Sequence, residues 1–104
     1  MAIEVRDNTG FRRYEIFVDG VQSGITEYRH EGSTLVLPHT LVDPRMRGKG
    51  LAALLVRRAL DDARANGLVV IPECWYVAEF INSHPEYSDL LAPSSVGGAE
   101  GAVL

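Results

Sequence analysis

The residues of this sequence best suited to bind a charged ligand lie in a basic stretch interrupted by glycines, residues 45–52. Gly48 and Gly50 come just before an amphipathic segment, so several backbone N–H groups at a helix start would have no intrahelical acceptor. The helix dipole favours an anion there, and three side chains add positive charge: Arg45, Arg47 and Lys49. Because short glycine motifs recur in unrelated proteins, the stretch alone fits a solvated loop as well as a phosphate site.

Three further residues have side chains that could take part in bond-making or proton transfer. Cys74 is the only cysteine, which excludes an intramolecular disulfide and a cysteine-based metal cluster, and we expect no metal site. Its thiol is either a small apolar packing group or a nucleophile. His39 is suited to accept a proton near neutral pH, and Glu73 is a second candidate base. The alternatives are a hydrogen-bonded structural histidine and a solvated carboxylate.

The composition of the 104-residue chain is that of a single globular domain, with 46% hydrophobic and 23% charged residues. A formal charge of −4 argues against a general nucleic-acid-binding surface, which usually needs an excess of basic residues. No apolar run approaches the roughly 18 residues of a membrane-spanning helix, and the first residues are charged. We therefore expect a cytoplasmic protein without a membrane or nucleic-acid partner.

The first part of the chain has the alternation of apolar and polar residues that predicts antiparallel strands. The four runs are 3–7, 14–18, 21–28 and 33–42, with turn residues at 8–10, 19–20 and 31–32. Gly24 predicts a bulge or a close approach of two backbones. Pro38 cannot donate to a sheet ladder, so it predicts an edge, a bulge or a splayed position in the fourth strand.

After Pro44 the apolar period becomes helical and predicts a helix that begins near Leu51 and ends at Asn66-Gly67. Its arginines are expected to pair with its aspartates on the exposed surface: Arg57, Arg58 and Arg64 with Asp61 and Asp62. Residues 68–71 predict a strand buried on both faces, and residues 75–83 a second helix. Pro85-Glu86-Tyr87 predicts a turn. Trp75, Tyr76 and Phe80 are expected to form core and pocket wall rather than a nucleic-acid platform.

These elements predict an α/β (α+β) fold: a four-stranded antiparallel meander, a crossover helix, a fifth strand parallel to the fourth and a closing helix. One domain would span residues 1–92, and the Ser-, Gly- and Ala-rich residues 93–104 would form a flexible tail. A strand-helix-strand crossover places the glycine stretch at the carboxyl end of its first strand, where open α/β sheets bind ligands.

In this context the sequence resembles the general-control-related N-acetyltransferases, abbreviated GNAT. Their Arg/Gln-x-x-Gly-x-Gly/Ala motif is matched by Arg45-Met46-Arg47-Gly48-Lys49-Gly50, followed by Leu51-Ala52. The chain is similar to a subgroup of very small, single-domain GNAT-like proteins with a cysteine after the fifth strand. Four stretches in the same order carry this resemblance: His39-Thr40-x-Val42, Gly48-Lys49-Gly50-Leu51-Ala52, Ile71-Pro72-x-Cys74-x-Tyr76-Val77 and His84-Pro85-Glu86-Tyr87.

The resemblance implies a minimal GNAT fold that takes acetyl-CoA or coenzyme A as substrate and binds its pyrophosphate through loop amides. The residues it implies for the cofactor are Val42, Arg45, Arg47, Gly48, Lys49, Gly50, Leu51 and Ala52. Asn82 is either a further cofactor contact or part of a solvated helix face. Larger members have one or two helices between their first two strands, and two later strands, that this chain lacks. An acceptor would therefore lie in an open groove, which favours a protein or peptide amine.

These observations lead us to expect an acetyl-CoA-dependent N-acetyltransferase acting on an amine, with Cys74, His39 and Glu73 as catalytic candidates and an acetyl-Cys74 intermediate as one route. The alternative is a CoA-binding or acyl-CoA-sensing module without transferase activity. A structural or interaction domain with neither property is the third class. The sequence leaves the oligomeric state open between a monomer and a weak homodimer.

Overall fold

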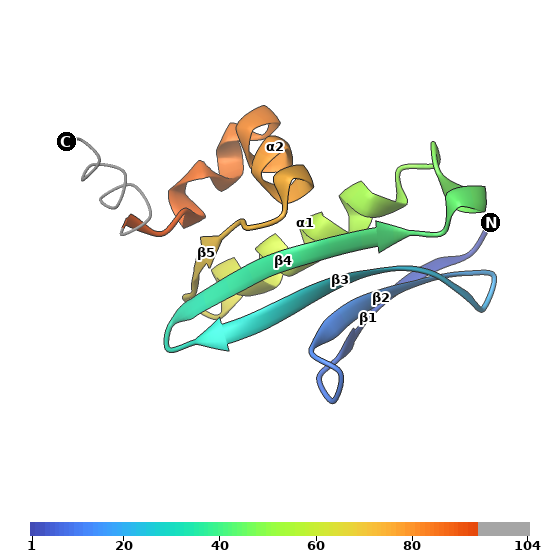
Figure 1. The fold of residues 1–104 in the computed structure, drawn as a ribbon, viewed down its shortest axis with the longest axis horizontal. Helices are drawn as coiled ribbons and strands as arrows, with labels where there is room; N and C mark the ends of the chain where they lie inside the picture. The colour runs from blue at the N-terminus through green and yellow to red at the C-terminus, as the bar shows by residue number, and fades with distance from the viewer. Residues whose placement is uncertain (94–104) are drawn as a thin grey trace.

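The computed structural model describes residues 1–93 and confirms the predicted α/β fold (Figure 1). The sheet contains, in sequence order, β1 (Ile3–Asn8), β2 (Arg13–Val18), β3 (Val21–Glu31), β4 (Thr34–Val42) and β5 (Val69–Ile71). The first four strands are antiparallel, and β5 is parallel to β4. The helices are α1 (Leu51–Ala65) and α2 (Trp75–Ser83), with short 3-10 helices η1 (Pro44–Met46) and η2 (Pro85–Leu90). Apart from Pro93, the predicted tail lies outside the described residues.

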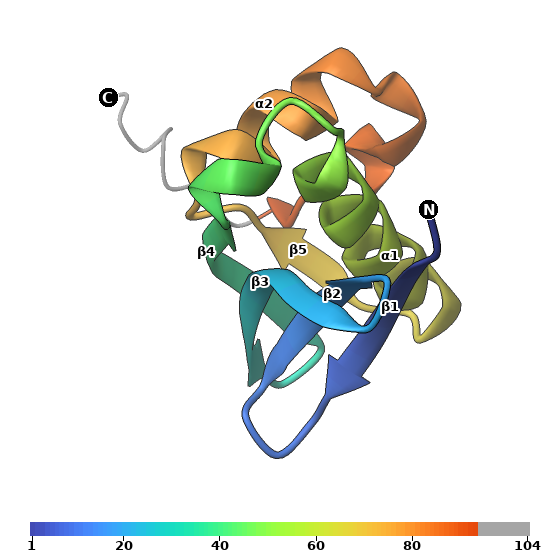
Figure 2. The same ribbon diagram turned by 90° about the vertical axis from the view of Figure 1, so that its right-hand side faces the viewer.

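The hydrophobic core lies between one face of the sheet and both α-helices, which Figure 2 shows on the same side. The predicted helical period forms the buried stripe of α1: Leu51, Leu55, Val56, Ala59, Leu60 and Ala63. The inward side chains of the strands, among them Ile16, Leu35 and Leu37, pack against it. No helix in residues 1–93 is long and apolar enough to cross a membrane.

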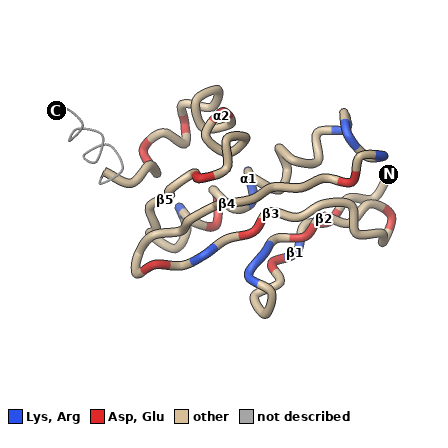
Figure 3. Tube along the Cα trace, in the orientation of Figure 1, with Lys and Arg blue, Asp and Glu red and all other residues tan. Residues whose placement is uncertain are grey.

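The opposite face of the sheet, called here the outer face, carries charged side chains in place of a second helical layer. Residues two apart on a strand share a face, and three Arg–Glu pairs use this spacing: Glu4–Arg6, Arg13–Glu15 and Arg29–Glu31. Figure 3 shows acidic and basic residues close together along these strands. Because the charges compensate one another, this face is stable in contact with water.

The turn and bulge expectations in the first sheet strands are largely confirmed. Gly24 lies beside a bulge in β3, and a Cβ there would come within 2.9 Å of the Leu41 carbonyl oxygen. The bulge and the close approach of two backbones predicted at this glycine are therefore both present. The predicted turn after β1 is present, with the Phe11 N–H group donating to the Asn8 carbonyl at 3.2 Å. It extends to Arg12, which has a positive φ of 53° and whose carbonyl accepts a hydrogen bond from the Tyr28 N–H group at 3.0 Å.

The expectation that residues 68–71 form a strand buried on both faces is wrong. β5 has three residues, and only Val70, which faces the core, is fully buried. Val69 and Ile71 lie on the outer face, which no helical layer covers in the residues that the structure describes. The outer edge of β5 is covered by the chain after η2, where the Ala92 N–H group donates to the Val70 carbonyl at 3.0 Å. A continuous apolar run therefore predicts the strand here, but it does not show whether both faces of the strand are covered.

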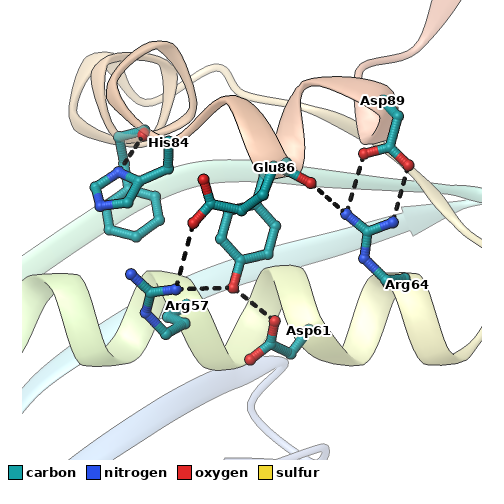
Figure 4. A network of polar contacts seen from close by, with 8 residues as sticks. Arg57, Asp61, Arg64, His84, Glu86 and Asp89 are labelled. Atoms are coloured by element: carbon teal, nitrogen blue, oxygen red, sulfur yellow. Dashed lines mark hydrogen bonds and ion pairs between the residues drawn. The ribbon is translucent and has the colours of Figure 1, made fainter.

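The pairing expected within α1 is confirmed only for Arg58 and Asp62, which lie 2.9 Å apart. The other arginines bind η2, which is a six-residue 3-10 helix rather than the predicted turn (Figure 4). Arg64 contacts Asp89 through both terminal nitrogens and the Glu86 carbonyl through one. The Tyr87 hydroxyl donates to Asp61 at 2.7 Å and accepts from Arg57 at 3.1 Å. These contacts fasten η2, and with it α2, to α1.

Candidate functional site

The sheet opens between β4 and β5. Their pairing covers three residues of each strand, and the last link is the Cys74 N–H group donating to the Leu37 carbonyl at 2.9 Å. Beyond this point, residues 38–42 of β4 have no strand beside them on that edge in the described part of the chain. Leu37 and Pro38 together lie opposite Tyr28 of β3, so the proline sits in a bulge. Of the alternatives for Pro38, the structure shows a bulge at the place where β4 and β5 separate.

A cleft follows this gap from the glycine loop to Cys74. It consists of two hollows of about 230 and 380 Å³ that share Val42, Arg47, Ala52 and Tyr76. The first hollow adds the loop and the start of α1, lined by Met46, Gly48, Gly50, Leu51 and Ala53. The second adds Thr40, Leu41, Cys74 and Trp75. The structure thus brings most of the predicted cofactor residues into one cleft with the predicted nucleophile.

The glycine loop leaves a row of backbone donors free. Gly48 and Gly50 have φ values of 82° and 77°, a left-handed conformation that glycine adopts without strain. Gly50 is the N-cap of α1, and because it has no side chain it offers no acceptor to the first turn. Within the described residues, none of the six N–H groups of residues 48–53 makes a hydrogen bond. This end of α1 can therefore donate to an anion.

The three predicted cations differ in availability. The Arg45 side chain binds the Asp43 carboxylate at 2.9 and 3.2 Å, and these hydrogen bonds lower the pKa of Asp43. Arg47 and Lys49 take part in no ion pair in the part of the chain that the structure covers. Seven of the ten basic residues are in ion pairs, and Arg12 is the third that is not. Free positive charge is thus concentrated at the loop.

Cys74 lies at the N-cap of α2, as the sequence suggested. Its thiol is half-buried and faces the cleft, and its side chain makes no capping hydrogen bond. The thiol is therefore accessible to a ligand in the cleft.

His39 lies on the outer face of β4, where its side chain is exposed. Its Nδ1 atom is 3.1 Å from the Pro38 carbonyl oxygen. A carbonyl oxygen can only accept, so Nδ1 carries the hydrogen, and in the neutral ring Nε2 keeps a free lone pair. No hydrogen bond joins His39 to Cys74 within residues 1–93. The structure therefore does not bring them together as a Cys–His pair.

The other two predicted side chains stand apart from the cleft. Glu73 contacts Arg29 at 3.5 Å, and the same arginine binds Glu31 at 2.7 Å. Asn82 is exposed on α2 and lines a separate hollow of about 260 Å³, together with Ile81 and Leu91. This position agrees with the alternative of a solvated helix face.

Tyr76 is the residue whose role the sequence analysis understated. It forms pocket wall as expected, but it lines both hollows of the cleft and lies two residues after Cys74. Burial raises the pKa of its hydroxyl, and the charge of Cys74 acts in the same direction. The hydroxyl therefore keeps its proton at neutral pH. The sequence did contain a signal for this role, because Tyr76 lies in the first turn of the predicted helix that follows Cys74.

Comparison with known proteins gives the same picture as the geometry. The family model described as GCN5-related N-acetyl-transferase matches residues 13–90. Protein NATD1 from Bos taurus is 30% identical over 95 residues, which cover 88% of this chain and 84% of the relative.

Two solved structures share the fold. The solution structure of a GCN5-like protein from Staphylococcus aureus has a TM-score of 0.68 at 21% identity, with 86% of this chain and 87% of that chain covered. N-acetylglutamate synthase from Neisseria gonorrhoeae, solved with coenzyme A and N-acetyl-glutamate, has a TM-score of 0.54 at 17% identity. The alignment covers 59% of this chain but only 15% of that longer one. The chain belongs to the GCN5-related N-acetyltransferase (GNAT) family.

Proposed function

We propose that this protein transfers the acetyl group of acetyl-CoA to an amine of a protein or peptide, through an acetyl thioester on Cys74. Family membership supports acetyl transfer as the general activity. The observation that carries the proposal is the cleft itself. It joins free amides and the unpaired Arg47 side chain at one end to the half-buried Cys74 thiol at the other.

The loop end of the cleft suits the pyrophosphate of acetyl-CoA. Six unpaired N–H groups, the positive end of α1 and the side chains of Arg47 and Lys49 all favour a bound anion. The free edge of β4 from residue 38 to residue 42 can hydrogen-bond the amide groups of the pantetheine arm. Binding in this direction would lead the thioester toward Cys74 and Tyr76.

The first chemical step forms a bond between the Cys74 sulfur and the acetyl carbon and breaks the bond from that carbon to the CoA sulfur. Tyr76 donates its proton to the departing CoA thiolate and regains one from the Cys74 thiol, so the products are acetyl-Cys74 and CoA-SH. In the second step the amine attacks the acetyl carbon and Cys74 leaves as the thiolate. Before the attack, Nε2 of His39 takes one proton from the ammonium form of the acceptor, and the proton that the nitrogen loses after the attack goes to the Cys74 thiolate, which becomes the thiol again.

The test is to incubate the protein with acetyl-CoA and weigh it intact. A gain of about 42 Da, one acetyl group in place of one hydrogen, is expected in the wild type and not in Cys74→Ser. Tyr76→Phe is expected to slow this gain. CoA should raise the melting temperature of the wild type and of Cys74→Ser alike, because Cys74 does not line the hollow at the loop.

Three results would contradict parts of the proposal. Acetylation of a peptide without any adduct on the protein would replace the Cys74 route by direct transfer. CoA binding with neither adduct nor peptide product would favour the sensing module. A melting temperature that CoA leaves unchanged would remove the cofactor assignment altogether.

A further inference from the structure

One carboxylate on the outer face lacks the partner that its neighbours have. Three glutamates of this face, and Glu73 in the connection after β5, each contact an arginine: Glu4, Glu15, Glu31 and Glu73. Glu27 of β3 is half-buried and has neither an ion pair nor a side-chain hydrogen bond among residues 1–93. A half-buried carboxylate has lost part of its hydration, so a cation from outside the chain would be bound favourably there.

The register of the sheet places Glu27 beside His39. The two residues are direct partners across β3 and β4, so their side chains leave the sheet on the same face. The preceding β3 residue and its partner, Thr26 and Thr40, face the core, and their hydroxyl oxygens are 3.3 Å apart. Glu27 and His39 therefore share the outer face, at the point where β4 loses its neighbour β5.

An amine acceptor brings the charge that Glu27 lacks. A lysine-like amine has a pKa near 10.4, so it arrives at neutral pH as an ammonium ion and must lose a proton before it can attack a thioester. Nε2 of His39 has a free lone pair to take that proton. The two arginines beside Glu27 do not repel the ammonium ion strongly, because glutamates bind each of them. Arg13, which lies directly opposite Glu27 on β2, binds Glu15, and Arg29 contacts Glu31 and Glu73.

We propose that Glu27 binds the ammonium group of the acceptor beside His39 and so selects alkylammonium substrates, an inference that rests on the proposed function. The ammonium N–H donates to the Glu27 carboxylate, and one ammonium proton passes to Nε2 of His39. The neutral amine then attacks the acetyl carbon, the bond from that carbon to the Cys74 sulfur breaks, and the second proton that the nitrogen loses goes to this sulfur, which ends as the thiol. Glu73, the carboxylate singled out from sequence, is held by Arg29 and is not needed for this step.

The test compares two acceptors of matched size, Nα-acetyl-lysine amide and Nα-acetyl-4-aminophenylalanine amide, whose aromatic amine is uncharged at neutral pH. In Glu27→Gln the KM for the lysine compound is expected to rise about tenfold or more, because a hydrogen bond between charged groups is lost. The kcat should stay within about twofold of the wild-type value. The KM for the aromatic amine should stay at its wild-type value. Glu79→Gln is the control, because Glu79 is likewise unpaired within the described chain but is exposed and lies on α2.

Equal losses with both acceptors, or an unchanged KM for the lysine compound, would overturn the assignment of Glu27. A second measurement does not depend on acetyl transfer. In a titration of the ¹⁵N-labelled protein with Nα-acetyl-lysine amide, the amide signals of residues 26–28 and 38–40 should shift in the wild type and in Glu79→Gln, but not in Glu27→Gln. Shifts without any acetyl transfer would refute the proposed function and keep this inference. Transfer without Glu27-dependent shifts would refute this inference alone.

Discussion

The replacement Gly48→Ala separates the two roles of the glycine loop, backbone conformation and anion binding. Gly48 has a φ of 82°, and a Cβ there would meet no atom within 4 Å, so the substitution introduces strain without a clash. Gly67 is a matched control at the other end of α1, with a φ of 69° and equally open surroundings. Each change should lower the free energy of unfolding by about 1 kcal/mol and the melting temperature by roughly 4 to 8 °C.

The two variants should differ in their response to CoA. At about 100 times the wild-type Kd, CoA stabilises the folded protein by about 2.7 kcal/mol, which raises the melting temperature by roughly 10 to 20 °C. In Gly48→Ala the added methyl group stands among the unpaired N–H groups of residues 48–53. A Kd weakened about tenfold would leave about 1.4 kcal/mol of stabilisation at the same CoA concentration. The rise in melting temperature should therefore fall to about half in Gly48→Ala and stay at the wild-type value in Gly67→Ala.

Thermal unfolding with and without CoA, supported by calorimetric Kd values, measures this difference. The unliganded variants serve as each other's reference, because both carry the same kind of backbone strain. If Gly48→Ala kept the full CoA-induced rise, or if Gly67→Ala lost as much of it, the loop would not be the pyrophosphate site.

Two further predictions concern hydrogen bonds that the structure reveals. Asp43→Asn should release Arg45, so CoA should bind more tightly at about 50 mM salt and lose more of that affinity at about 300 mM, where screening is stronger; an unchanged Kd at both concentrations would contradict this. The Tyr14 hydroxyl donates to Asp62 at 2.8 Å, and burial, followed by this hydrogen bond, raises the pKa of Tyr14 far above 10. Folding therefore favours the protonated hydroxyl, and its stabilisation is complete below about pH 10 and is lost as the pH rises further. Measured by urea unfolding, the free energy of unfolding of Tyr14→Phe should be about 1 kcal/mol lower than that of the wild type at about pH 9, and the two values should approach each other at about pH 11. A difference that stays constant with pH would refute the argument.

The sequence by itself determined the elements and their order. The period of the apolar residues predicted the four meander strands, α1 and α2. Side chains return to the same face every two residues in a strand and every 3.6 residues in a helix. The sequence also located the glycine loop, since the left-handed conformation of Gly48 and Gly50 is a local property of the backbone. Cys74 at the start of α2 followed from the same local pattern.

The tertiary structure decided which of these residues are available for chemistry. Arg45 is held by Asp43 whereas Arg47 is not, and Arg57 and Arg64 bind η2 rather than the aspartates of their own helix. The edge position of β5 and the place of Glu27 opposite His39 depend on strand order and register. Local patterns depend on neighbours in the chain, which the sequence contains directly. Burial and pairing depend on segments that meet only after folding, and so could not be read from the pattern of residues alone.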